Sequence, residues 1–452
     1  MTLELPSNSQ QIRAMIRYPN SATEIQQTLS AGLRSGGRGR ALWVVASWIL
    51  GLAPLLFLPP AAGAGASTQA GTAPPGSKLE ASIPVGPLGY HPPGVLYMLS
   101  KLSFGSLDFI DSSHLLFTFH ESRLLRRIDA NDPTEDDQMI HAVVLGVPGG
   151  QVSASADWLM RDRDRYLWPL GDGRFLVRQR NTYFTTDSSL KLHGFIGSPT
   201  QVRATEVSPD GQILVVEEDY EKHTPEVHQK LAAEAARLGE PPPDEDIELA
   251  LVNLSNRAVR VALRVELPIA LPVTSSGYLN VTREKDDEFV MHFIPFQGQE
   301  VILGKVNSSC TPRERFLNPN VLMIESCSPV TDDVLLDTWT IDGRRLWRGR
   351  RDGRSVWPTF ATAQNGSRFA VGMLRTTHSI NLADSLNDED VKQQMVQVFD
   401  TRTGALLLTT DASPIQSAGQ NFALSPDGAR LAVLREGAIE VFAVPSAPPA
   451  QK

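Results

Sequence analysis

A turn that recurs along the chain is the feature that most constrains its fold. Residues 208–211 and 425–428 both read Ser-Pro-Asp-Gly, and a short apolar run follows each copy, at 213–216 and 431–434. Proline presets the first corner of such a turn, aspartate bonds the nearby backbone, and glycine accepts the positive φ that returns the chain. Looser copies recur at residues 112–114, 171–173, 286–288, 318–320 and 364–366. The pattern predicts seven tight turns, each leading into a buried strand.

A second hairpin signal, centred on an acidic or amide residue, alternates with the first. It occurs at residues 127–129, 186–188, 252–254, 340–343 and 398–404, and a β-rich run follows each copy. One repeat therefore holds an inner and an outer hairpin, and four-stranded units repeated around a ring make a β-propeller. We predict an all-β fold, a seven-bladed β-propeller. Eight blades is the alternative, because 77 residues separate Asp210 from Asp287, unless a 28-residue insert accounts for the gap.

The same motifs resemble those of known proteins. Ser-Pro-Asp-Gly before a strand, together with the Asp-x-x-Thr-Gly hairpin at residues 400–404, is similar to bacterial exported propellers of the TolB-like, YVTN-like and WD40-like repeat families. The resemblance covers about residues 95–444 and implies the propeller fold. It implies little about activity, because these motifs shape turns rather than sites.

The last repeat stops one strand short of four. It offers strands near residues 421–424, 431–434 and 439–442 and then ends. An open ring would expose unpaired strand edges, so another part of the chain must complete the blade. We predict that residues 95–99 supply the outer strand. On this interpretation the propeller spans residues 95–444, and a disordered tail follows at 445–452.

The region before the repeats has a different composition. A polar and basic leader at residues 1–40 precedes a segment at 41–66 that begins with eighteen mostly apolar residues, 41–58, and ends in small residues. This order predicts a secretory signal peptide cleaved after Ala64 or Ala66. An uncleaved membrane anchor is the alternative, since eighteen apolar residues can just span a bilayer. Residues 67–94, rich in Pro, Gly and Ala, are predicted to be a linker.

Both interpretations of the N-terminal segment place the propeller outside the cytoplasm, either in the periplasm or anchored to the inner membrane. The whole chain has a formal net charge of −9, and without residues 1–66 it holds 37 basic and 49 acidic residues, a net charge of −12. A nucleic-acid or anionic-lipid surface needs a basic field, so both partners are excluded. Contact with the membrane is expected only through residues 41–58, if they are not cleaved.

The chain has two cysteines, Cys310 and Cys327, with sixteen residues between them. Cys310 is expected at the exit of the fourth repeat and Cys327 at the end of the next inner strand, where adjacent blades can bring them together. In an oxidising compartment this predicts a disulfide. Two thiols with no neighbouring histidine do not make a metal site, and the acidic clusters do not match the ligand order of a calcium loop. No metal or cofactor is predicted.

Two repeats carry long insertions, at residues 219–246 and 376–391, and residues 225–238 have helical spacing. Long loops on a rigid scaffold commonly carry binding sites, although they can also be decoration. No nucleophile elbow, phosphate-binding loop or haem motif occurs in the sequence. The leading hypothesis is therefore a non-catalytic exported propeller that binds a protein, peptide or glycan at the cell envelope.

An enzyme is the alternative hypothesis, either a lactonase or a quinoprotein-like oxidoreductase. Its residues would converge in the central channel from several blades, which a single sequence does not reveal. Such a site would show carboxylates or histidines with perturbed pKa values at one channel mouth. The charged run at residues 161–165 precedes an inner strand, so one or two of its side chains are expected in the channel. The basic stretch at residues 344–354 is expected on the exposed rim of an outer hairpin.

Overall fold

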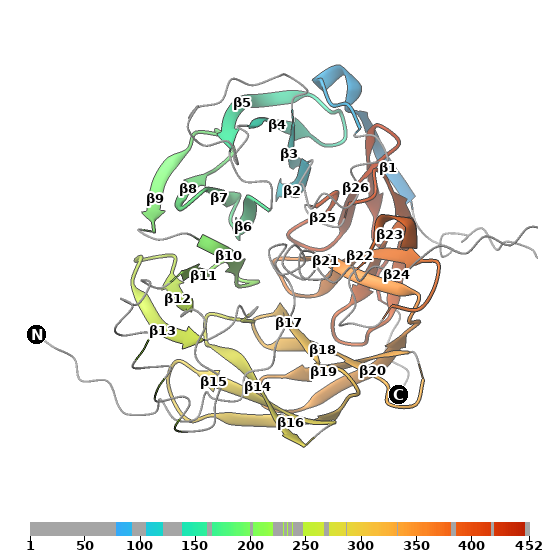
Figure 1. Cartoon of the computed structure of the whole chain (residues 1–452). Coiled ribbons are helices and arrows are strands. Elements are labelled where there is room, and N and C mark those ends of the chain that lie inside the picture. Colours follow the sequence, from blue (N-terminus) through green and yellow to red (C-terminus); the bar gives the residue numbers. More distant parts are fainter. Residues whose placement is uncertain are drawn as a thin grey trace, which may run out of the picture. The chain divides into compact units, whose positions relative to one another are not determined.

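The chain forms seven antiparallel β-sheets arranged around one axis as the blades of a propeller (Figure 1). The computed structural model describes residues 78–92, 105–120, 138–160, 165–198, 202–219, 229, 233, 237, 247–265, 271–285, 287–331, 333–380, 386–416 and 420–447. Within these residues six sheets have four strands and one has three. The predicted all-β, seven-bladed propeller is confirmed, and the alternative of eight blades is wrong.

The blades follow one another in chain order, and strands A to D of each blade run from the axis outwards. Blade 1 holds β2 (Gly105–Asp111), β3 (His114–His120), β4 (Gln138–Gly146) and β5 (Val152–Met160). Blade 2 holds β6 (Leu167–Gly171), β7 (Arg174–Gln179), β8 (Thr182–Thr186) and β9 (His193–Gly197). Blade 3 holds β10 (Val202–Val207), β11 (Ile213–Asp219), β12 (Ile247–Asn253) and β13 (Val259–Val265).

The remaining four blades complete the ring. Blade 4 holds β14 (Gly277–Lys285), β15 (Glu288–Pro295) and β16 (Val301–Asn307). Blade 5 holds β17 (Arg313–Asn318), β18 (Val321–Cys327), β19 (Val334–Thr340) and β20 (Arg345–Arg351). Blade 6 holds β21 (Ser355–Thr362), β22 (Arg368–Thr376), β23 (Val391–Asp400) and β24 (Leu406–Ala412), with the short 3-10 helix η3 (Asp388–Asp390) before β23. Blade 7 holds β25 (Phe422–Leu424), β26 (Arg430–Arg435), β27 (Ala438–Ala443) and β1 (Lys78–Pro84).

The Ser-Pro-Asp-Gly motif forms the turn between strands A and B. In blade 3 the Ser208 hydroxyl donates to Asp210 Oδ1 at 2.5 Å and accepts the Ile213 N–H at 2.9 Å. Gly211 adopts a φ of +64°, and a Cβ there would lie 2.3 Å from the Leu170 carbonyl oxygen of blade 2. The glycine therefore serves both the turn and its close packing against the neighbouring blade.

Blade 4 departs from the predicted pattern. The turn at residues 286–288 was expected between strands A and B, but it joins β14 to β15, which are strands B and C. The inner position is held by residues 271–273, where Val273 forms a single β-bridge with Tyr278 and the Pro272 carbonyl accepts the Leu279 N–H at 3.0 Å. Pro272 has no N–H to donate, which limits the ladder at this position.

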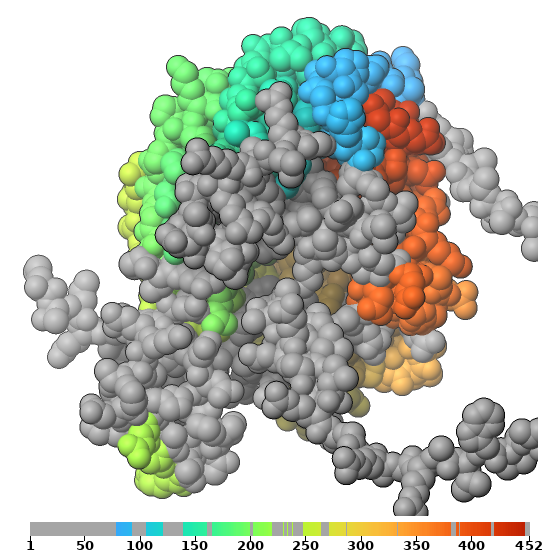
Figure 2. Space-filling view, turned by 45° about the horizontal axis from the view of Figure 1, so that its top comes forward, coloured from blue at the N-terminus to red at the C-terminus, as the bar shows by residue number. Residues whose placement is uncertain are grey.

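A strand from the N-terminal side of the propeller closes the ring. β1 pairs antiparallel with β27 from Lys78 to Pro84 and becomes the outer strand of blade 7. In Figure 2 the blue segment that contains β1 lies between the red last blade and the teal first blade. The expectation that the chain closes in this way is correct, but the strand is wrong: residues 78–84 fill the position, inside the predicted linker 67–94. Residues 95–99 lie outside the described residues.

The segment after β1 ties blade 7 to blade 1. It contains the 3-10 helix η1 (Gly86–Leu88), and the buried Tyr90 packs edge-on against Phe117 and Phe119 of β3, with ring centroids 5.4 Å and 5.6 Å away. Burial raises the pKa of the Tyr90 hydroxyl well above its ordinary value. The closing strand and this aromatic contact together bury the seam of the ring.

The apolar core is divided among the seven interfaces between neighbouring blades. Successive residues of a B strand face opposite sides because side chains alternate along a strand. In β11, Leu214 and Val216 pack toward blade 2, whereas Ile213 and Val215 pack toward blade 4. This explains the apolar runs after each turn, since both faces of these strands are buried.

All seven blades carry a β-bulge near the start of strand D. The C–D ladder skips one residue of the outer strand, for example at Ser153 in β5 and at Glu80 in β1. Bulges twist an edge strand and make it a poor template for pairing with another chain. The outer edges of the propeller are therefore protected against edge-to-edge association.

The predicted disulfide is present. Cys310, in the connection from β16 to β17, is bonded to Cys327 at the end of β18, with Cα atoms 5.5 Å apart. The Ser308 hydroxyl reinforces the same corner by accepting the Cys327 N–H at 2.9 Å. The bond links the exit of blade 4 to strand B of blade 5.

We expect the free energy of unfolding of the Cys310→Ser/Cys327→Ser variant to be about 3 kcal/mol lower than that of the wild type. The disulfide closes a loop and so lowers the conformational entropy of the unfolded chain, and for a loop of this length that effect is worth about 3 kcal/mol. Urea unfolding of the oxidised protein against the variant measures the difference. A reducing agent should lower the wild-type midpoint and leave that of the variant unchanged. Equal midpoints for oxidised and reduced wild-type protein would contradict the prediction.

Several sequence predictions fall on residues that the structure does not describe. These are the leader 1–40, the segment 41–66 and most of the insert 219–246, of which Gln229, Ala233 and Arg237 are helical and exposed. The helical insert and the signal or anchor segment therefore stay predictions. Among the described residues, no helix has the length and apolar character needed to cross a membrane.

Candidate functional site

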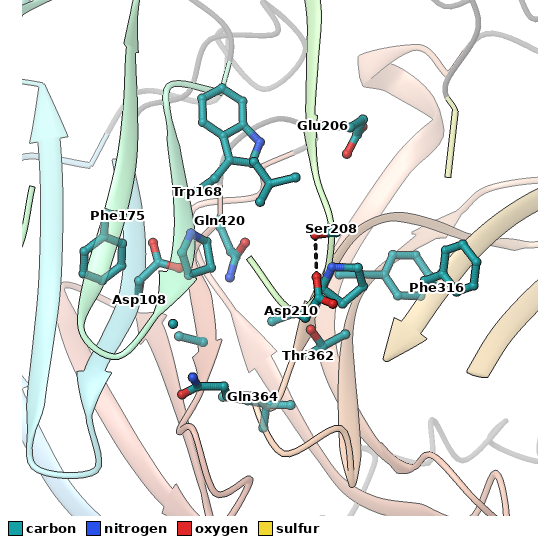
Figure 3. A pocket seen from close by; sticks show the side chains of 18 of the residues that line it. Asp108, Trp168, Phe175, Glu206, Ser208, Asp210, Phe316, Thr362, Gln364 and Gln420 are labelled. Carbon is teal, nitrogen blue, oxygen red and sulfur yellow. Dashed lines mark hydrogen bonds between the residues drawn. The ribbon is translucent and has the colours of Figure 1, made fainter. Parts of the chain in front are cut away.

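The axis of the propeller contains a chamber of about 540 Å³ near the A–B turns. All seven blades contribute to its wall, through strand A, the turn that follows it, or residues 271–273 in blade 4. The polar side chains that matter for its chemistry are Asp108, Arg165, Trp168, Glu206, Glu314, Arg315, Thr359 and Gln420. Figure 3 shows Asp108, Trp168, Glu206 and Gln420 around this cavity.

Three carboxylates reach the chamber from three different blades. Asp108 of β2 is 4% exposed and accepts a hydrogen bond from the Ser106 hydroxyl at 2.9 Å. Burial raises its pKa to about 7, against the opposing effects of the Arg165 guanidinium and of Ser106. Burial also raises the pKa of Glu314 in β17 to about 8, while its own backbone N–H and Arg315 act in the opposite direction.

Glu206, the third carboxylate, is on β10. Its side chain is accessible from the cavity, but the surrounding protein still raises its pKa, because Arg165 and Arg315 only partly offset the loss of bulk solvent. A carboxyl whose pKa is raised lies in a place where negative charge is poorly compensated. The three carboxyls therefore ionise less readily than they would in water, and a cation bound beside them would favour their ionised form.

Two arginines contribute the positive charge of the inner wall. Arg165 donates from Nε to the Leu167 carbonyl at 3.1 Å, and its guanidinium lies 5.6 Å from the centre of the Trp168 ring. Arg315 stacks on Phe360, with its guanidinium carbon 3.6 Å from the ring centre. Burial lowers the pKa of Arg315, against the effects of Glu325 and Glu206. Both guanidinium groups are thus held against aromatic rings rather than paired directly with one carboxylate.

Some buried polar atoms of the wall have no hydrogen-bond partner among the residues that the structure describes. They are Trp168 Nε1, Glu314 Oε1 and Thr359 Oγ1. The Trp168 side chain is almost completely buried, at 3% exposure, and its indole nitrogen is on the side of Glu206 (Figure 3). A buried polar atom without a partner costs free energy unless a ligand or water completes it. The chamber therefore lacks both an acceptor for Trp168 and a donor for Glu314.

The mouth of the chamber is formed by the A–B turns, which carry further acidic residues. Asp172 and Asp210 line the cavity beside Arg174. At the turn of blade 1, slight burial would raise the pKa of Asp111, but hydrogen bonds from Ser113 and His114 outweigh it and hold the pKa below its usual range. Ionised aspartates at the entrance favour the approach of a positively charged group.

The sequence analysis located only part of this site. Arg165, from the charged run 161–165, lines the chamber as expected. The basic stretch 344–354 lies mainly on the outer strand β20, where Arg345 and Arg348 pair with Asp337. Asp108, Glu206 and Glu314 were missed. Each stands in an inner strand two to four residues before a recurring turn, so an acidic residue at that position was an available signal.

The described residues of the two inserts are not among those that line this chamber. Both follow a B strand, β11 or β22, and therefore leave the blade at the end opposite the A–B turns. Among the described residues, no group of three or more His, Cys, Asp or Glu side chains is placed to hold a metal ion. The site consists of isolated carboxylates, arginines and an indole around a shared cavity.

We expect Asp108 to make stability depend on pH. Its pKa is higher in the folded protein than the unperturbed value of 3.8. The contribution of Asp108 to stability is therefore fully present below pH 3.8 and is lost as the pH rises through about 7. Between pH 5 and pH 8 the free energy of unfolding of the wild type should fall by roughly 2–4 kcal/mol more than that of Asp108→Asn. Urea unfolding of both proteins at the two pH values measures this difference.

The control for this measurement is Asp111→Asn, in the same strand. The pKa of Asp111 is lowered in the folded protein, so removing it should not reduce the loss of stability toward pH 8. Identical pH dependence in wild type and Asp108→Asn would show that Asp108 is not desolvated in the folded state.

Comparisons with known proteins find distant likenesses among solved structures. Neither a scan against protein-family models nor a search of curated proteins finds a match. Similar solved structures include the acylaminoacyl peptidase of Pyrococcus horikoshii, at 8% identity over 76% of this chain and 51% of that one, with a TM-score of 0.45. They also include TolB from Acinetobacter baumannii, at 13% identity over 73% and 79% of the two chains, with a TM-score of 0.35.

The C-terminal WD40 domain of Sif2 is similar at 11% identity over 77% of this chain and 94% of that one, with a TM-score of 0.35. This chain spans about half the length of the peptidase. Likenesses this distant carry no information about activity or partners. The function must be argued from the chamber itself.

Proposed function

We propose that this chain is a non-catalytic binding propeller that recognises a protein or peptide through its axial chamber. The observation that carries the proposal is the convergence of carboxylates, guanidinium groups and an unpartnered indole N–H from separate blades into one cavity. Binding sites are typically concave, with a few placed polar groups in a rigid wall. The ring of blades supplies that rigidity, because each inner strand is fixed by two packed interfaces.

A peptide fits this wall better than a glycan. The aromatic rings offer little open face, since Trp168 is 3% exposed and the Phe360 ring is covered by the Arg315 guanidinium. A sugar ring would need such a face to stack on. Charged and hydrogen-bonding groups dominate instead, and these match the amide groups and charged side chains of a peptide.

We further propose that the propeller works outside the cytoplasm. The Cys310–Cys327 disulfide supports this location, because disulfides persist in oxidising compartments such as the bacterial periplasm. Export would follow from residues 41–66, as a cleaved signal or as an anchor.

The proposal is tested by recovery of a partner from envelope extract with the full chain as bait. Three variants are compared with wild type: Glu206→Arg in the chamber, Asp411→Arg on the exposed outer strand β24, and a chain in which the loop 381–385 is shortened. Loss of one specific partner with Glu206→Arg alone supports recognition at the chamber. Recovery unaffected by Glu206→Arg but lost on shortening the loop would overturn the chamber as the recognition site.

An enzyme with a channel site remains the second candidate, and one observation favours it. Asp108 and Glu314, with pKa values raised to about 7 and about 8, are suited to general acid–base chemistry near neutral pH. This candidate predicts lactone hydrolysis or quinone-dependent oxidation by the purified chain, abolished in Asp108→Asn. Turnover that survives Asp108→Asn and Glu314→Gln would show that these carboxyls are not catalytic.

A further inference from the structure

The charged side chains of the chamber are unequal in number. Among the residues that the structure describes, five acidic and three basic ones line it; the acidic ones are Asp108, Asp172, Glu206, Asp210 and Glu314, and the basic ones are Arg165, Arg174 and Arg315. In the inner wall, three carboxylates face two guanidinium groups, both of which are stacked on aromatic rings. A ligand that completes this wall must bring positive charge.

The same wall also favours a ligand that carries a hydrogen-bond acceptor. Within the described part of the chain, neither the buried N–H of Trp168 nor Glu314 Oε1 has a hydrogen-bond partner. These two atoms need opposite hydrogen-bond partners. The indole N–H can only donate and needs an acceptor, whereas the carboxylate oxygen accepts and needs a donor. A group that presents a cation next to a carbonyl oxygen satisfies both, and a peptide offers this combination at its N-terminus and around a lysine residue.

The form of the cation follows from the arrangement of the carboxylates. They come from blades 1, 3 and 5 and so approach the axis from three directions. No three of the described acidic side chains stand close enough together to hold one ion, so a bound cation pairs with a single carboxylate, and a compact ammonium group needs less room there than a planar guanidinium group. A cavity of about 540 Å³ has the size of a site for a small ligand or a few residues, not for a folded element.

We propose that the axial chamber binds an ammonium group of a peptide, either a lysine side chain or a free N-terminus, beside Glu206, with a neighbouring carbonyl oxygen on the indole N–H of Trp168 and with Asp108 and Glu314 adding negative charge to the same chamber. This inference rests on the proposed function, because it names the ligand of the same chamber. The raised pKa values of the carboxyls agree with it, since a cation bound beside them would favour their ionised form.

The experiment is a titration of the full chain with four short glycine-based peptides, followed by calorimetry or NMR. One has an internal lysine and both ends blocked, and one has a free N-terminus and no lysine. The third replaces the lysine of the first by norleucine, and the fourth is blocked pentaglycine. We expect one ammonium peptide to bind at least tenfold more tightly than its neutral counterpart, and the arm that binds identifies the source of the ammonium.

Variants locate the binding in the chamber. Glu206→Gln should weaken the favoured peptide about tenfold or more, and Glu206→Lys should abolish its binding by placing an ammonium there. Asp411→Arg on β24 should leave the affinity unchanged. Glu314→Gln should also weaken binding, and a thermal melt no lower than that of wild type shows that this loss does not come from unfolding.

Equal binding of all four peptides, no binding of any of them, or unchanged affinity in Glu206→Lys would each overturn the inference. The proposed function is tested separately by the envelope partner. A partner that depends on Glu206 while no ammonium peptide binds would refute the ammonium ligand and leave peptide or protein recognition standing. If that partner is also insensitive to Glu206→Arg, both fail.

Discussion

Replacement of Ile83 by alanine is expected to lower the free energy of unfolding by roughly 2–5 kcal/mol, although Ile83 stands in the outermost strand of a blade. The side chain is 3% exposed and belongs to the cluster that joins blade 7 to blade 1. Its strand, β1, is the piece of chain that closes the ring. The substitution therefore leaves a cavity at the seam that all seven blades depend on.

The matched control is Leu79→Ala in the same strand. Leu79 is 48% exposed, so its truncation should change stability by no more than about 0.5 kcal/mol. Urea unfolding followed by circular dichroism measures both variants. Removal of residues 78–84 should be more damaging than either, because it leaves β27 as an open edge and uncovers the core beneath it. If Ile83→Ala and Leu79→Ala have the same small effect, β1 does not close the ring.

Arg351→Ala is expected to destabilise the protein by roughly 3–5 kcal/mol, because it leaves a buried carboxylate without its partner. Arg351 Nη2 lies 3.2 Å from Glu325 Oε1, and the two side chains are 3% and 2% exposed. The same guanidinium donates to the Ser355 carbonyl at the start of β21 and lies 5.5 Å from the centre of the Trp357 ring. The arginine thus joins blade 5 to blade 6 as well as neutralising Glu325.

Arg350→Ala is the control, one residue away on β20. Its side chain is 73% exposed and its pairing with Asp333 spans 3.3 Å, so less than about 1 kcal/mol should be lost. The double variant Glu325→Gln/Arg351→Met should recover much of the stability, because it removes both buried charges. A loss for Arg351→Ala no larger than that for Arg350→Ala would mean that Glu325 is solvated in the folded state.

The blade count followed from the sequence because turn chemistry is local. The hydrogen bonds of Ser208 and Asp210 lie within five residues of each other in the chain, so the motif carries its own structure. The apolar runs after the turns were equally informative. A B strand is buried on both faces, so its sequence is continuously apolar instead of alternating between apolar and polar residues. The disulfide was predictable because Cys310 and Cys327 flank one blade boundary.

Blade 4 and the closing strand were misread because their identity depends on pairing over distance. The polar residues after Lys285, followed by an apolar run, resemble the looser copies of the A–B turn, and only the bridge between Val273 and Tyr278 shows that the inner position lies earlier in the chain. Residues 78–84 resemble a linker locally and become a strand because β27, whose paired residues lie 354 to 365 positions later in the chain, offers an unpaired edge. Such pairing has no local signature.

The sequence alone therefore determined the architecture: the number of blades and the covalent link between Cys310 and Cys327. Only the tertiary structure decided where a ligand can bind. Asp108, Glu206 and Glu314 lie in different blades about 100 residues apart and become one site because the ring brings every inner strand to the axis. Their desolvation is also a product of the closed ring, since no stretch of sequence can show that a carboxylate is enclosed by distant strands.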